Sequence, residues 1–136
     1  MSQDLHDEFK RLARLVIDTF QREAGLILRY DEQSMEYLDG YISRNRAAIQ
    51  KTDGQSQGAV NMIGSFLGEA VIANFGGQWK QSETGAWGVY FDEKNAIFPF
   101  VKVAKAFGPQ GAFDSIASFY SLSKLLKEGK LEADGS

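Results

Sequence analysis

The stretch Ile63-Gly64-Ser65-Phe66-Leu67-Gly68-Glu69-Ala70-Val71-Ile72-Ala73-Asn74-Phe75-Gly76-Gly77-Gln78-Trp79 decides the fold of this chain. Its first part has the composition of a helix that is apolar on nearly every side, with Glu69 as its one carboxylate. A helix without a wide polar face normally lies at the centre of a fold. We therefore predict that a helix over residues 59–75 organises the domain. The pair Gly76-Gly77 is expected to end it, because glycine adopts left-handed backbone angles without strain.

Two amphipathic helices are predicted before this central helix. Residues 3–23 and 32–50 both carry apolar residues at steps of three or four, which is the helical period. Asp31 precedes the second helix and is its expected N-cap. The buried stripes are expected to contain Leu5, Phe9, Leu12, Val16 and Phe20 in the first helix and Met35, Leu38, Ile42 and Ile49 in the second.

The part of the chain after Gly77 alternates in a way that is typical of short strands. Residues 78–82 and 87–91 predict a hairpin, and residues 96–98 predict a third strand. A short helix is expected over residues 100–107, and a last one begins at Asp114 or Ser115. The order ααα-βββ-αα predicts an α+β fold, with helices around a small three-stranded antiparallel sheet. We expect one domain over residues 1–136, whose polar tail, residues 128–136, is frayed.

Composition narrows the possible functions. The chain has 136 residues, 43% of them hydrophobic and 24% charged, which is typical of one globular domain that buries a sizeable core. It contains no cysteine, so disulfides, thiolate metal sites and cysteine nucleophiles are excluded. The net charge is −3 and basic residues are interspersed with acidic ones. Nucleic-acid binding requires clustered Lys and Arg, so the sequence disfavours a nucleic-acid partner.

The pattern of apolar residues also bears on localisation. The N-terminus is charged from Asp4 onward and has no apolar segment of the secretory kind. The most apolar helix is interrupted by Asn61, Glu69 and Asn74, so we do not predict a membrane span, which needs about 20 predominantly apolar residues. A cytoplasmic protein is the resulting expectation.

The single histidine, His6, is the first candidate for chemistry. It lies in the first turn of the first predicted helix, beside Asp7 and Glu8, which favours a surface position. A serine hydrolase would need a Gly-x-Ser-x-Gly turn, and the sequence has none. Histidine-rich and cysteine-rich metal sites lack their ligands. We therefore predict no catalytic histidine, no metal and no cofactor.

Glu69 is the second candidate, and two interpretations of it remain open. In the first, Glu69 acts in a pocket lined by Trp79 and Trp87, which would make the domain a small-molecule binder or an enzyme. In the second, the carboxylate is a structural buried acid that bonds to Lys102, Lys105, the Trp79 indole or the glycine turn, since a buried charge needs a partner. We favour the structural role, because no second catalytic group is near it in the sequence.

The second helix carries the clearest pattern for a binding surface. Because successive helical residues are about 100° apart, Tyr37, Tyr41 and Arg44 lie along one side. Glu36 and Asp39 lie on the opposite flank. Tyr and Arg are the residue types that dominate interface hot spots. The two tyrosines either pack beneath another element or belong to that surface, and we predict these five residues as the partner-binding set.

One segment resembles a known group of proteins. Its motifs are Tyr30-Asp31-x-x-Ser34-x-x-x-Leu38-Asp39-x-Tyr41-Ile42, Gly64-x-Phe66-Leu67-Gly68-Glu69, Gly76-Gly77-x-Trp79, Phe98-Pro99-Phe100-x-Lys102-Val103 and Asp114-Ser115-Ile116. Over about residues 30–120 it resembles small, largely uncharacterised bacterial domains, some of which look like immunity proteins encoded beside secreted toxins. The resemblance implies a non-enzymatic protein that binds another protein, and it brings no catalytic residues.

These observations lead to a ranked set of functions. The first is an immunity protein that binds a cognate bacterial toxin and neutralises it. The second is the small-molecule-binding or enzymatic domain that uses Glu69. The third is a regulatory subunit or a self-associating scaffold, and the oligomeric state stays open.

Overall fold

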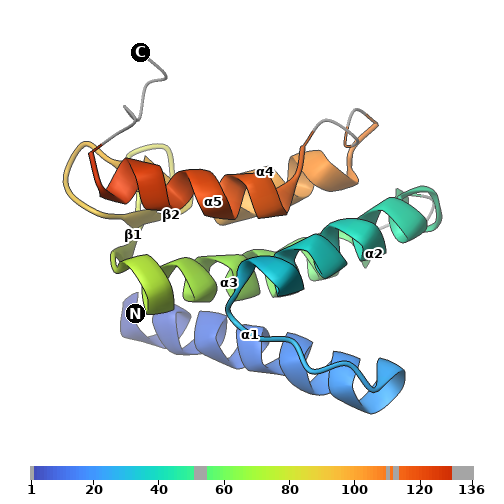
Figure 1. Ribbon diagram of the computed structural model, residues 1–136. Helices are drawn as coiled ribbons and strands as arrows, with labels where there is room; N and C mark the ends of the chain where they lie inside the picture. The colour runs from blue at the N-terminus through green and yellow to red at the C-terminus, as the bar shows by residue number, and fades with distance from the viewer. Residues whose placement is uncertain (1, 51–54, 110, 112–113, 130–136) are drawn as a thin grey trace.

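The computed structural model describes residues 2–50, 55–109, 111 and 114–129. Its element order confirms the predicted ααα-βββ-αα arrangement and the three-stranded antiparallel sheet. Figure 1 shows α1 in one layer, α2 and α3 in the next, and α4 and α5 beyond them. The elements are α1 (Ser2–Ala24), α2 (Glu32–Gln50), α3 (Gln55–Phe75), β1 (Gln78–Gln81), β2 (Trp87–Tyr90), β3 (Ala96–Ile97), α4 (Pro99–Phe107) and α5 (Ile116–Lys127).

The helix α3 is the centre of the fold, as its composition predicts. It packs against α1, α2, α4 and α5 and also contacts the sheet. Residues 63–68 form an unbroken buried run, which explains why no polar face is present there. The helix begins at Gln55, four residues earlier than predicted. Residues 51–54, which precede it, lie outside the described residues.

The length and composition of α3 also meet the criteria for a membrane-spanning helix. Within the described part of the chain, one segment, Gln57–Phe75, is long and apolar enough to cross a membrane. Half of that segment is buried by the rest of the chain. A central core helix meets the same criteria, and α3 packs against four other helices and the sheet.

Local signals begin and end the helices as expected. The Asp31 carboxylate accepts a hydrogen bond from the Ser34 amide at 2.8 Å, which confirms Asp31 as the N-cap of α2. The Ser34 hydroxyl in turn accepts from the Arg29 amide at 2.8 Å. At the other end of the core, α3 stops where Gly76 and Gly77 take φ angles of 87° and 101°. Side chains with a Cβ atom rarely adopt such angles, so the glycine pair ends the helix as predicted.

The small sheet places one buried residue from each strand in a row. Trp79 of β1 lies opposite Val89 of β2, and Val89 lies opposite Ile97 of β3. All three side chains are buried. Each strand is one residue shorter than predicted. β1 gives way to the turn in which the Ser82 amide bonds to the Ala86 carbonyl, and β3 ends where Phe98 becomes the N-cap of α4.

Two glycines of α3 make room for aromatic rings. A Cβ atom on Gly68 would collide with the Trp79 ring, and one on Gly64 would collide with the Phe100 ring. The Gly-x-x-x-Gly spacing by itself predicts room for a neighbouring backbone. In the structure the Trp79 and Phe100 rings lie nearest to the two glycines, and they stack on each other with centroids 5.4 Å apart. The sheet and α4 are thereby joined to α3.

The last two helices, α4 and α5, both contact α2. Pro99 is the first residue of α4, a position that suits proline because its missing N–H has no helical partner. Ser115 is the N-cap of α5, and its hydroxyl accepts from the Ser118 amide at 3.1 Å. The Arg46 guanidinium of α2 donates to the Ala106 carbonyl, near the end of α4, at 2.8 Å. On α5, Ile116, Tyr120 and Leu126 are buried, and Phe119 is half-buried.

Candidate functional site

The predicted partner-binding residues lie on two different sides of α2. Tyr37 and Tyr41 face α1 and α3 and line an apolar groove. Glu36 and Asp39 face α5 and line a separate acidic groove. The structure therefore brings the five residues together as two groups and not as one surface, because positions 36 and 37 point to different flanks of the helix.

The apolar groove lies where α1 and α2 diverge above α3. Figure 1 shows these two helices moving apart toward the side where both of them end. The groove has a volume of about 600 Å³. We call it the three-helix groove, and its lining residues are Val16, Thr19, Phe20, Glu23, Ala24, Tyr37, Tyr41, Ile49, Gly58, Ala59, Met62 and Ile63.

Aromatic contacts set the shape of the three-helix groove. The Phe20 ring meets the Tyr37 and Tyr41 rings edge-on, with centroids 5.7 Å and 5.1 Å apart. The Arg44 guanidinium lies over the Tyr37 ring at 5.7 Å. All three aromatic side chains are half-buried, so one part of each ring packs and the other part lines the groove. Both interpretations of the tyrosines, packing and surface, therefore apply to the same side chains.

Several groove residues are not apparent from the sequence. The helical pattern assigns Phe20 and Ile49 to buried stripes, yet both are half-buried and line the groove. The same pattern does not mark Met62. A helical period shows which residues point inward, but a groove appears only where two inward faces diverge. That divergence depends on how α1 and α2 cross, which no local pattern encodes.

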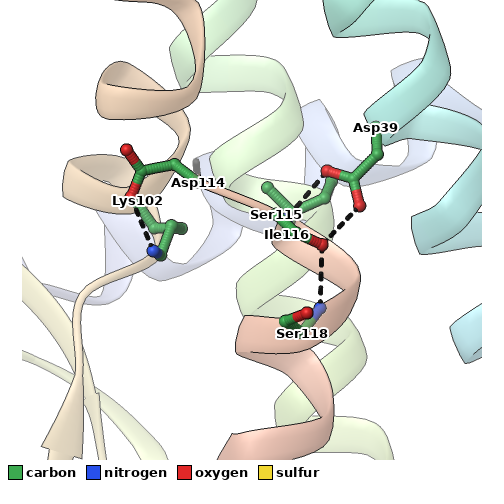
Figure 2. A network of polar contacts seen from close by, with 6 residues as sticks. All are labelled: Asp39, Lys102, Asp114, Ser115, Ile116 and Ser118. Atoms are coloured by element: carbon green, nitrogen blue, oxygen red, sulfur yellow. Dashed lines mark hydrogen bonds and ion pairs between the residues drawn. The ribbon is translucent and has the colours of Figure 1, made fainter. Parts of the chain in front are cut away.

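The acidic groove lies between α2 and α5 and has a volume of about 740 Å³. The Asp39 carboxylate is bonded to the start of α5, as Figure 2 shows for its bonds to Ser115 and Ile116. It accepts from the Ser115 hydroxyl at 2.8 Å, the Ile116 amide at 2.7 Å and the Ala117 amide at 3.1 Å. A carboxylate at a helix N-terminus satisfies free amides and interacts well with the helix dipole. Asp39 thus has a structural role that the sequence did not indicate.

Two further polar contacts lie near the bonds of Asp39 to α5. The Ser121 hydroxyl donates to the Glu32 carboxylate at 2.6 Å. Just before α5, the Lys102 ammonium bonds to the Asp114 carboxylate at 2.8 Å (Figure 2). This hydrogen bond lowers the pKa of Asp114 below its ordinary value, and the charge of Lys102 adds to the effect.

Glu69 makes one of the contacts that the sequence suggested. The Trp79 indole N–H donates to its carboxylate at 2.8 Å. The sequence predicts a buried acid, and in the structure the Glu69 side chain is half-buried. The charge of Glu69 also acts on Tyr30. Burial raises the pKa of Tyr30, and the negative charge of Glu69 raises it further.

The two tryptophans proposed to line a pocket at Glu69 share a filled aromatic cluster. The Phe9 ring contacts Trp79 at 4.5 Å and Trp87 at 5.5 Å between centroids. Phe9 also contacts Phe100 at 5.2 Å. Neither Glu69 nor Trp87 is a lining residue of the three-helix groove or the acidic groove. The arrangement is that of a core with a hydrogen-bonded carboxylate at its edge.

His6 lies beside this cluster. Its ring meets Trp87 edge-on at 5.7 Å, and the side chain is half-buried. Among the described residues, no group of three or more His, Cys, Asp and Glu side chains is arranged to hold a metal ion.

Similarity to other proteins adds nothing to this geometry. No family model matches the chain, and no curated protein or solved structure is significantly similar to it. The choice of a binding surface therefore depends on the grooves and the residues that line them.

Proposed function

We propose that this protein is a non-enzymatic protein-binding domain and that the three-helix groove receives its partner. The observation that carries this proposal is an open groove of about 600 Å³ lined by apolar and aromatic side chains from three helices. Tyr, Phe and Met are enriched in the cores of protein interfaces. Half-buried rings that are already held by their neighbours lose little side-chain freedom on binding, which favours affinity.

The shape and charge of the groove favour an amphipathic helix or an apolar loop as the bound segment. A groove between helices takes the apolar face of such a segment, while polar groups at the rim meet its flanks. Among the described residues that line the groove, Glu23 is the charged one, and the chain as a whole carries a net charge of −3. Charge complementarity therefore favours a partner with basic residues beside its apolar face.

We propose further that the partner is a bacterial toxin and that this protein is its cytoplasmic immunity protein. The resemblance of residues 30–120 to immunity-protein-like domains supports this choice. Inhibition would result from steric occlusion once the toxin segment fills the groove. The acidic charge would speed the encounter, and the aromatic anchors would slow dissociation.

Co-expression with the product of the neighbouring gene tests both parts of the proposal. We expect growth to be rescued and the two proteins to co-purify. Met62→Lys places a charge in the groove and should abolish both effects. Ile27→Lys, at a side chain that is 59% exposed and outside the groove, should preserve them.

Thermal unfolding of both variants establishes that they fold. If the wild type neither rescues growth nor co-purifies, the toxin proposal fails. If folded Met62→Lys still binds, the partner uses another surface.

The alternative function, a small-molecule site or enzyme that uses Glu69, has a separate test. Glu69→Gln keeps an acceptor for the Trp79 indole and removes the charge. A structural role predicts a change in stability with partner binding retained. Loss of a turnover in a variant that remains folded would instead support the enzymatic alternative.

A further inference from the structure

We propose that a second copy of this chain binds the outer face of α5, so that the protein forms a symmetric dimer with the two α5 helices parallel. The surface involved, which we call the α5 ridge, consists of Ser118, Ser121, Leu122 and Leu125. Leu122 is 48% exposed and Leu125 is 37% exposed. Both leucines lie outside the buried core of the domain.

Apolar exposure is concentrated around the α5 ridge. Within the described part of the chain, five large apolar side chains are exposed, and Leu122, Leu125 and Val101 are three of them. Val101 and Leu122 line the same groove between α4 and α5. Isolated apolar residues are ordinary on a surface, but a cluster on one face is typical of an interaction site.

The two sides of the ridge carry opposite charges. Leu122 lines the acidic groove on the α2 side, together with Glu32 and Glu36. It also lines the groove on the α4 side, together with Lys102 and Lys105. Asp39 is bonded to the start of α5 and Lys102 is paired with Asp114, whereas Glu36 on one side and Lys105 on the other are exposed charges.

This charge pattern is complementary to itself. A two-fold axis parallel to α5 turns a second copy over and places its acidic side above the basic side of the first. A two-fold axis across α5 would instead place acid over acid and base over base. Interfaces between identical chains are normally two-fold, and charge sets their orientation. The pattern therefore selects the parallel arrangement and makes this chain its own fitting partner.

The α5 ridge is independent of the three-helix groove. Tyr37 and Glu36 lie on different sides of α2, and only the Glu36 side faces α5. A dimer through the ridge leaves the three-helix groove open. The dimer can therefore form whether or not the proposed function is correct.

Sedimentation velocity over a wide range of protein concentration tests the proposal. The wild type should form a dimer as concentration rises. Glu36→Lys and Lys105→Glu, each alone, should weaken the dimer more than about tenfold, because each places like charges across the interface. An equimolar mixture of the two variants should form a heterodimer, since one variant then presents positive charges on both sides of its ridge and the other presents negative charges.

Lys10→Glu is the matched control, because this exposed lysine on α1 lies away from the ridge and its reversal should leave dimer formation unchanged. Circular dichroism confirms that the variants fold. A wild type that stays monomeric at every concentration overturns the proposal. A dimer that both reversals leave intact overturns it as well, since it would use a different face.

Discussion

At the scale of single residues, α2 holds both ends of the connection between α4 and α5. Asp39 accepts from the first amides of α5, and Arg46 donates to a carbonyl near the end of α4. A negative charge at a helix start and a positive charge at a helix end both interact favourably with the helix dipole. Asp39 and Arg46, both on α2, thus fix the positions of α5 and α4. This explains how these two short helices pack against α2 in one defined position.

Replacing Asp39 should therefore destabilise the whole fold. Asp39→Ala leaves the Ile116 and Ala117 amides without their acceptor, and we expect the free energy of unfolding to fall by about 1–3 kcal/mol. Asp39→Asn should cost less, since its carbonyl oxygen still accepts. Urea denaturation measures both changes. Asp18→Ala, at an exposed position on α1, is the control and should change stability by less than about 0.5 kcal/mol.

The Lys102–Asp114 pair should make stability depend on pH in the acid range. The hydrogen bond from Lys102 holds the pKa of Asp114 below its ordinary value in the folded state. A depressed pKa contributes stability above the unfolded-state pKa of about 3.9, and this contribution is lost as pH falls through the folded-state pKa. Lys102→Met should flatten this acid part of the curve of unfolding free energy against pH. An unchanged slope in the variant would show that the pair does not contribute.

At the scale of elements, close contact between α3 and aromatic rings joins the helices to the sheet. The effect should be visible in a pair of glycines from the same helix. Gly68→Ala places a methyl group against the Trp79 ring, so overpacking of about 1–3 kcal/mol should outweigh the gain in helix propensity. Gly58→Ala meets nothing within 4 Å and should stabilise the protein by about 0.5–1 kcal/mol.

Thermal unfolding measures the stability of each variant. Near-ultraviolet circular dichroism of tryptophan reports whether the surroundings of the Trp79 ring have changed. We expect Gly68→Ala to lower the melting temperature and to change the tryptophan signal, because the ring must move. Gly58→Ala should raise the melting temperature with an unchanged signal. Equal effects of the two variants would mean that helix propensity alone determines the change in stability, and that the contact between Gly68 and the Trp79 ring is not tight.

At the scale of the whole molecule, the sequence predicts the helices and strands well, and it predicts the contacts between them less well. The central position of α3, the N-cap at Asp31 and the glycine stop all follow from signals within a few residues. The bond between Asp39 and Ile116 joins positions 77 residues apart, so no local pattern indicates it. The three-helix groove depends on the crossing of α1 and α2, and the division of the predicted binding residues between two grooves depends on where α5 packs.

The central place of α3 leads to a prediction for the unfolding of the entire chain. Its residues from Ile63 to Val71 are buried except for the half-buried Glu69, and α3 packs against four helices and the sheet, so most of these amides can meet solvent only when the surrounding elements separate. We expect these amides to be the slowest to exchange with deuterium, at a rate set by global unfolding, and to become faster in urea with the slope of the global transition. Amides of the first turns of α1, where Leu5 of the predicted buried stripe is instead 42% exposed, should exchange earlier through local opening. Early exchange within α3 would mean that the outer helices form the most stable unit of the fold. In that case α3 would depend on the outer helices for its stability, and they would not depend on α3.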